Sequence, residues 1–464
     1  MNAVVVGIVG YVGLQILIGV WVSRRIATET DYILAGRSLG VMLGGVSIFA
    51  TWFGAEVIMG AAGAVYTEGL SGAQAEPFAY AAGILVMAAL FAARLWRRGI
   101  QTFGDFFRAR YSPGVEKLAV VLLIPGSVFW AAAQIRGFGQ IVGSAAGLEV
   151  ATAITIAALC VVIYSVLGGL LADVYTDFIQ GIVIVTGLVL LVVVVLAQAG
   201  GLPTALEKVE PARLALFEQD WALLAFLERW AIPICGSVVA VELISRILAC
   251  RSPEVARTAA AVGGGGYLLI ALIPVTLGLI GPSLLPDLAE AEQLIPELAK
   301  ALLPTLLYVI FVGALVSAIL STVDSTLIAS GSMLSHNLLA RINPINTEAG
   351  KLRLARLSVA ALGAVAYILA LRATRISELV EMASAFASAG IFVTLVFGLF
   401  TRIGGPASAV AAMIAGASVW LTGEMVLGWE TPYIAGLAGA TIAYVAAAAL
   451  SPSPKSAWTD PEKT

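Results

Sequence analysis

Long apolar runs, separated by short polar stretches, follow one another along nearly the whole chain. A run of about 20 apolar residues is long enough for a helix to cross a bilayer, and the sequence holds about 13 runs of this kind. They are centred near residues 13, 53, 86, 131, 160, 187, 237, 268, 320, 363, 390, 417 and 441. The pattern predicts an all-α polytopic membrane protein with one transmembrane domain over residues 1–450. A disordered, Pro- and Ser-containing tail is expected over residues 451–464.

The composition excludes an ordinary soluble enzyme. Of the 464 residues, 60% are hydrophobic and only 12% are charged, whereas soluble domains carry about 25% charged residues. The three cysteines, Cys160, Cys235 and Cys250, lack metal-ligand spacing, and we expect the single histidine, His336, to be solvated at the end of its helix. We therefore expect no enzyme, no nucleic-acid partner and no obligatory protein partner, only membrane lipid and a small solute.

The distribution of basic residues predicts the orientation of the chain. Most of the 26 Lys and Arg residues fall in one alternate set of loops, in which we place Arg246, and Arg136 alone falls within a span. Loops rich in Lys and Arg stay in the cytoplasm. An odd number of spans then puts the N-terminus outside and the C-terminus inside the cell membrane.

Two spans carry residues that interrupt helices near their centres. The second span contains "ATWFGAE" (50–56), and the seventh contains "AIPICGS" (231–237), where Pro233 removes a donor and Gly236 loosens the turn. Non-helical backbone survives at mid-depth only where it lines a cavity or binds an ion. Broken helices at matching positions are typical of inverted-repeat transporters, although ordinary kinks in packed helices would give the same pattern.

The ninth span presents small and hydroxyl residues on one face. In "ALVSAILSTVDSTLIASGSML", Ala318, Ser321, Thr322 and Ser325 have the spacing i, i+3, i+4 and i+7. Such a face allows close helix packing, but hydroxyl oxygens beside a helix break are also hard ligands for a sodium ion. Asp324 in the same span makes simple packing the weaker explanation.

Three segments in order resemble one family. They are "DYILAGRSLG" (31–40) leading into "IFATWFGAE", "YSVLGGLLADVYTDFIQG" (164–181) and "SAILSTVDSTLIASGSML" (317–334). The sequence resembles the solute:sodium symporter family over nearly its whole length. This resemblance implies the LeuT-type fold, with two inverted five-helix repeats at about 41–200 and 221–402.

The resemblance also implies a sodium site between the second and ninth spans. Its ligands would be the carbonyls of Ala50, Phe53 and Ala318 and the hydroxyls of Ser321 and Thr322. By the same resemblance, Asp177 and Ser325 could hold or relay a second sodium ion.

For the solute, the local motifs are most similar to the choline-transporter branch. Matching positions imply that Trp52 and Trp130 enclose an ammonium group by cation–π contact, whereas Ala240 stands where that branch has a third tryptophan. The further candidate solute contacts are Glu56, Gln134 and Glu242. Two carboxylates favour a cationic or zwitterionic amine, such as an amino acid or a choline-like solute.

Glu56 needs a partner or a wet cavity, because a carboxylate at bilayer depth is costly. The solute and Arg136 are both candidates for that partner. Arg136 follows Gln134 by two residues, about 200° round the helix, so the two side chains face different neighbours. Arg136 either forms a structural ion pair or binds a carboxylate of the solute.

The function predicted from these observations is sodium-coupled symport of a small polar solute by alternating access. Proton coupling is the nearest alternative, since Glu56, Asp177 and Asp324 could each titrate. A sodium channel is less favoured because the polar residues cluster at mid-depth. A transporter-like sensor is less favoured because the tail is too short for a signalling domain.

Overall fold

The structure, a computed structural model, describes residues 3–217, 223–373 and 375–451. The predicted tail over 451–464 lies outside these residues, apart from Ser451. In the described ranges the regular structure is helical, and one isolated β-bridge joins Leu39 to Cys250. The α-helices are α1 (Ala3–Ser23), α2 (Glu29–Leu34), α3 (Val41–Trp52), α4 (Ala62–Glu68), α5 (Tyr80–Val86), α6 (Ala92–Trp96), α7 (Phe103–Arg110), α8 (Pro113–Ala146), α9 (Val150–Ala199), α10 (Leu202–Glu207), α11 (Leu223–Val239), α12 (Val241–Ala249), α13 (Pro253–Leu284), α14 (Leu294–Leu302), α15 (Thr305–Met333), α16 (Ala340–Ile342), α17 (Glu348–Arg372), α18 (Ile376–Ala385), α19 (Ser388–Phe400), α20 (Pro406–Leu421) and α21 (Pro432–Leu450).

Most of the predicted spans coincide with long apolar helices, and two coincide with shorter ones. Within the described residues, 10 helices are long and apolar enough to cross a membrane, and the bent pair α11 and α12 makes up to 11. Two shorter apolar helices, Val41–Trp52 and Val150–Ile163, supply the remaining apolar runs. The chain is therefore the polytopic helical protein that the hydropathy pattern predicts.

Helix α9 consists of two helical parts that join at a glycine, and it covers two of the predicted spans. Gly169, inside α9, has φ 57°, a left-handed conformation that glycine adopts without a steric penalty. A Cβ at this position would approach the Tyr32 ring to 2.5 Å. The bend thus requires glycine for both its backbone conformation and its packing against α2.

Two further breaks lie where the sequence predicts a functional site. Helix α3 ends at Trp52, Phe53 takes non-helical angles (φ −99°, ψ 66°), and helical structure resumes at Ala55. Helices α11 and α12 meet at an extended Ala240 (φ −63°, ψ 122°) with a 42° bend. Both breaks interrupt apolar helices, as the sequence predicts.

The exact position of the second break was predicted wrongly. Pro233 and Gly236 both lie inside α11, which continues to Val239. A proline removes a single donor, and this helix continues past it. Gly236 instead permits a close approach of α18, since a Cβ there would lie 3.0 Å from the Ser384 carbonyl oxygen.

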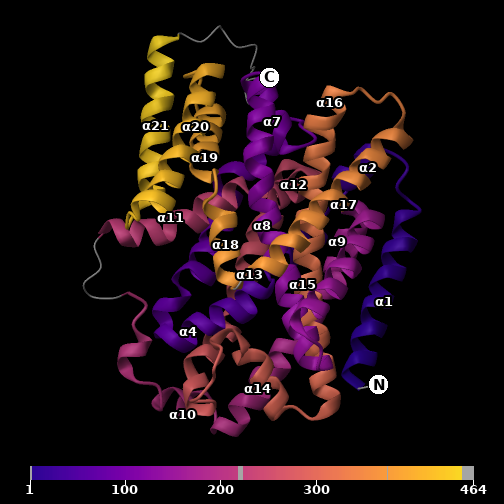
Figure 1. The fold of residues 1–464 in the computed structure, drawn as a ribbon, viewed down its shortest axis with the longest axis vertical. Coiled ribbons are helices and arrows are strands. Elements are labelled where there is room, and N and C mark those ends of the chain that lie inside the picture. Colours follow the sequence, from indigo (N-terminus) through magenta and orange to yellow (C-terminus); the bar gives the residue numbers. More distant parts are fainter. Residues whose placement is uncertain (1–2, 218–222, 374, 452–464) are drawn as a thin grey trace.

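The arrangement of the helices places α15 at the centre of the bundle, against α3, α8, α9 and α17. Figure 1 shows α1 on one flank and α20 and α21 on the opposite flank. Helices α10 and α14 lie at one end of the long axis, and α2, α7 and α16 lie at the other. Helix α1 begins at the α14 end and α21 ends at the α7 end (Figure 1), which is the arrangement expected for an odd number of spans.

Candidate functional site

Four of the five predicted sodium ligands meet where the end of α3 contacts the middle of α15. The Ser321 hydroxyl lies 2.8 Å from the carbonyl oxygens of both Ala50 and Ala318. The Thr322 hydroxyl lies 3.5 Å from the Ala50 carbonyl oxygen and 3.0 Å from that of Ala318. All four residues are buried. The chain thus offers two carbonyls and two hydroxyls, a hard oxygen donor set that suits a small hard cation.

The Ala50 carbonyl is available because its usual helical donor is bonded elsewhere. In a continuous helix the N–H of Gly54 would donate to Ala50, and that of Ala55 to Thr51. Here the Gly54 N–H donates to Glu56 Oε1 at 3.2 Å, and the Ala55 N–H donates to Gln134 Oε1 at 2.9 Å. Glu56 and Gln134 therefore satisfy the donors that follow the break, and the Ala50 carbonyl accepts from the hydroxyls of α15 in place of a main-chain N–H.

Glu56 and Gln134 also bond to each other, since Gln134 Nε2 donates to Glu56 Oε2. Both side chains are buried, at 2% and 0% exposure. The hydrogen-bond partners of Glu56 are thus the side-chain amide of Gln134 and the N–H of Gly54 at the break. Arg136, on another face of α8, donates from Nη1 to the Ala370 carbonyl of α17 at 3.2 Å.

Phe53 lies at the break itself and is fully buried. Its ring packs against Phe49 on α3 and against Tyr267 on α13, at centroid distances of 5.1 and 6.0 Å. This packing anchors the break between two helices. The role of the Phe53 carbonyl as a fifth sodium ligand stays a prediction.

Beside the break lies a cavity with aromatic walls and one carboxylate. Trp52, Trp130 and Tyr80 line it, and the ring centroids of Trp130 lie 6.4 Å from Trp52 and 5.7 Å from Tyr80. Glu242, two residues beyond the break at Ala240, also lines the cavity. Of the predicted solute contacts, Trp52, Trp130 and Glu242 thus share one cavity, whereas Glu56 and Gln134 support the helix break next to it.

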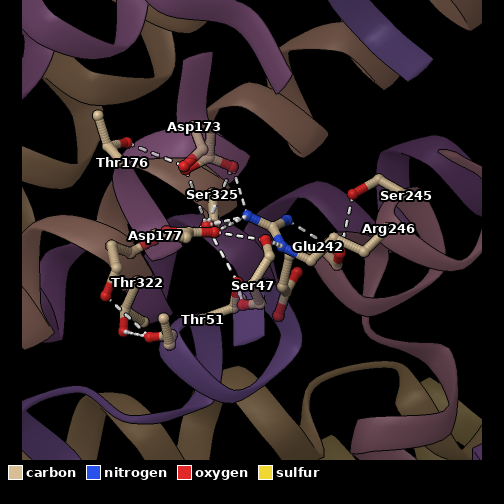
Figure 2. Close-up of polar contacts among 12 residues, drawn as sticks. Ser47, Thr51, Asp173, Thr176, Asp177, Glu242, Ser245, Arg246, Thr322 and Ser325 are labelled. Carbon is tan, nitrogen blue, oxygen red and sulfur yellow. Dashed lines mark hydrogen bonds and ion pairs between the residues drawn. The ribbon is translucent and has the colours of Figure 1, made fainter. Parts of the chain in front are cut away.

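A buried cluster of charged side chains lies around Ser325, one helical turn along α15 from the predicted sodium ligands. Figure 2 shows the Arg246 side chain of α12 reaching toward Asp173 and Asp177 of α9 and toward Ser325 of α15. Its guanidinium forms ion pairs with Asp173 and, at 3.2 Å, with Asp177. It also donates to Ser325 and, from Nε, to the Ser47 hydroxyl of α3 at 2.9 Å. The cluster therefore joins four elements of the bundle.

The placement of Arg246 corrects the sequence prediction. The distribution of basic residues predicts a cytoplasmic loop for Arg246 and leaves Arg136 as the only basic residue within a span. In the structure Arg246 is 0% exposed inside α12, the second part of a broken span. The carboxylates Asp173, Asp177 and Asp324 indicate a buried cationic partner, because charges within a bilayer pair with one another. This was the signal in the sequence that could have placed Arg246 inside the bundle.

The surroundings of His336 also differ from the prediction of a solvated residue. Its side chain is largely buried, at 15% exposure, and it is paired: its Nδ1 lies 3.0 Å from Glu29 Oε1, and its Nε2 lies 3.6 Å from Asp105 Oδ1. Burial alone would raise the pKa of Asp105, but hydrogen bonds from His336 and from backbone N–H groups lower it. This polar network ties α2 and α7 to the end of α15.

The comparisons with known proteins agree with this geometry. The model of the sodium:solute symporter family matches residues 32–416, well over half of the chain. The chain belongs to the sodium:solute symporter family.

Two curated relatives and one solved structure show the breadth of this similarity. The symporter is 26% identical over 448 residues to high affinity choline transporter 1 of Homo sapiens, covering 90% of this chain and 76% of the relative. It is 27% identical over 472 residues to the high-affinity proline transporter PutP of Bacillus subtilis (strain 168), covering 96% and 98%. A Na+-coupled sialic acid symporter in a substrate-bound outward-open state matches with a TM-score of 0.83 and 17% identity, over 98% of this chain and 99% of that one.

These findings confirm the predicted family and the LeuT-type helical fold of the symporter. They also identify the chain as a multi-pass membrane transporter and not an enzyme.

Proposed function

We propose that this symporter imports a small amine, cationic or zwitterionic, together with sodium, by alternating access. The observation that carries this proposal is the cavity that Trp52, Trp130 and Tyr80 line together with one carboxylate, Glu242. Aromatic faces attract ammonium groups, and a carboxylate adds charge complementarity. The carboxylate would repel an anionic solute, and a purely apolar solute would leave the carboxylate without a partner.

Sodium is the proposed driving ion because its proposed ligands come from two separate helices, one of which ends at a break. Ala50 belongs to α3, whereas Ala318, Ser321 and Thr322 belong to α15. An ion can drive a conformational cycle only if it binds the two states differently. A site that joins α3 to α15 meets this requirement, since movement of α3 relative to α15 would separate the ligands.

The energy of one sodium ion is sufficient for this task. One positive charge crossing 100 mV releases about 2.3 kcal/mol, and a tenfold sodium gradient adds about 1.4 kcal/mol. The sum, about 3.7 kcal/mol, supports roughly a 500-fold gradient of a neutral or zwitterionic solute. A cationic solute would also be drawn inward by the membrane potential.

Uptake into proteoliposomes tests the proposal. Purified symporter should accumulate a labelled choline-like amine or amino acid in an inward sodium gradient and fail to do so in potassium. Glu242→Gln should weaken binding of a cationic amine about tenfold, because one charge is lost from the cavity, while sodium binding persists. Equal uptake of amines by wild type and Glu242→Gln would contradict the role of the carboxylate.

Proton coupling remains the second candidate, on a separate observation. Glu76 is buried within electrostatic range of Glu56. Tyr267 donates to Glu76 Oε2, and Glu76 Oε1 has no hydrogen-bond partner within the described residues. A buried carboxylate without a cationic partner favours the binding of a proton. Uptake driven by a pH gradient without sodium would establish this candidate and refute sodium coupling.

We also propose that the end of the bundle bearing α2, α7 and α16 faces the cytoplasm of the cell. The helices at this end carry Arg108, Arg110 and Arg341, and cytoplasmic segments are rich in such residues. The N-terminus would then be outside and the C-terminus inside. Labelling of single cysteines introduced next to α14 and α16 with a membrane-impermeant reagent in intact cells would test this orientation, since only the former should react.

A further inference from the structure

The residues that resemblance assigns to a second sodium ion, Asp177 and Ser325, are already bonded to a cation. Nη2 of Arg246 lies 3.2 Å from Asp177 Oδ2 and also donates to Ser325 Oγ (Figure 2). Ser325 Oγ in turn lies 3.2 Å from both carboxylate oxygens of Asp173. Of the oxygens that a second sodium ion would need, the guanidinium thus holds Asp177 Oδ2 and Ser325 Oγ, whereas Asp177 Oδ1 has no hydrogen-bond partner within the described residues.

The guanidinium is held firmly in this place. Its Nη1 donates to the Glu242 carbonyl, one turn earlier in its own helix, at 3.2 Å, and its Nε donates to Ser47. Arginine stays protonated at all relevant pH values, so the charge cannot leave the site as a proton. The side chain is also fully buried, so it cannot exchange with solvent ions without a movement of α12.

A sodium ion beside this group would meet strong repulsion. Two unit charges about 4 Å apart at an effective dielectric constant of about 20 repel each other enough to weaken binding roughly a thousandfold. By contrast, the first sodium site lies one turn away along α15, at Ser321 and Thr322, where its oxygens do not contact Arg246. The carboxylates of the cluster, Asp173 and Asp177, outnumber the single guanidinium and so favour a cation at that first site.

We propose that Arg246 is a tethered cation that occupies the place of a second sodium ion, so that the symporter couples one sodium ion to each solute. This inference rests on the proposed sodium site and extends it, since it sets the number of sodium ions at one for each solute. It also gives the buried ion pair a role beyond stability: it supplies a permanent positive charge where a second ion would otherwise bind.

The sodium dependence of uptake tests the inference. In wild type the sodium exponent should be close to one. Arg246→Gln removes the charge and keeps an amide donor, so it should open the site between Asp177 and Ser325 and raise the exponent toward two. The double variant Arg246→Gln with Asp177→Asn removes the opened site and should return the exponent to one.

Arg110→Gln is the matched control, because Arg110 is also a buried arginine but donates to the carbonyls of Gly398, Ile403 and Gly404, away from the cluster. It should leave the exponent at one. If Arg246→Gln does not fold, Asp177→Asn in the presence of Arg246 serves instead, and its exponent should stay at one.

Different results would overturn the inference and the proposed function. A wild-type exponent of two that falls to one in Asp177→Asn would show that sodium binds beside Arg246 and would refute the tethered cation. An exponent of one in folded, active Arg246→Gln would refute it as well. Uptake by wild type that is independent of sodium would instead refute the proposed sodium coupling itself.

Discussion

The hydrogen bonds of Gln134 at the break in α3 make its replacement by leucine the most informative change in this protein. Leucine has a similar size and no hydrogen-bonding group. Gln134→Leu removes the acceptor of the Ala55 N–H and the donor to Glu56 Oε2. The Ala55 N–H would then regain a partner by closing onto the Thr51 carbonyl, which continues the helix and draws α3 away from α15.

The size of the effect follows from these two hydrogen bonds. Each is worth about 1 kcal/mol net, so the open break loses about 2 kcal/mol relative to the closed helix. Because the proposed sodium site requires the open break, we expect roughly a 30-fold weaker sodium affinity. Solute affinity at saturating sodium should change little, because Gln134 does not line the cavity.

The assay is a sodium titration of thermal stability in purified protein, followed by sodium-dependent uptake in proteoliposomes. Gln140→Leu is the matched control on the same helix, since Gln140 Oε1 has no hydrogen-bond partner within the described residues. A folded Gln134→Leu protein with the sodium affinity of wild type would refute the reasoning. Equal losses in the Gln134 and Gln140 variants would show a general effect on α8.

Further changes test the site and the fold. Ser321→Ala should raise the sodium concentration needed for half-maximal uptake at least tenfold without lowering the thermal midpoint, and an unchanged requirement would mean that this face of α15 serves packing alone. Gly169→Ala should destabilise the protein by about 1–3 kcal/mol, because its φ is 57° and its Cβ would clash with Tyr32. Gly266→Ala, where nothing lies within 4 Å of the added Cβ, should leave the thermal midpoint of the protein unchanged or slightly higher. Glu228→Gln should lower the thermal midpoint measurably, because the Glu228 carboxylate accepts the first N–H groups of α21 at 2.6 and 2.7 Å; an unchanged midpoint would show that solvent caps this helix equally well.

Local patterns were sufficient for much of the candidate site. The spacing of Ala318, Ser321 and Thr322 placed their oxygens on one helical face, and the structure brings that face to the Ala50 carbonyl. The interruption at Phe53 was also visible in the sequence. Both features depend on the residues of a single helix, whose geometry is fixed by its own periodicity.

The position of the second break could not be found in the same way. Pro233 and Gly236 suggested a break by their intrinsic conformational preferences, yet the helix bends at Ala240, an ordinary residue. A single missing donor is tolerated within a helix, so local chemistry does not decide where a helix yields. The packing of α11 against α18 and of α12 in the bundle interior decides it.

The membrane class, the spans and the hydroxyl face of α15 could be predicted from local patterns, because bilayer thickness and helix periodicity act over a few turns of chain. The partners of the buried charges depend instead on how the helices pack. Arg246 meets Asp173 and Asp177 across 73 and 69 residues of sequence, and Glu56 meets Gln134 across 78. A buried charge is stabilised by whichever opposite charge or dipole the packed helices bring within a few ångströms, and that choice is made by the bundle as a whole.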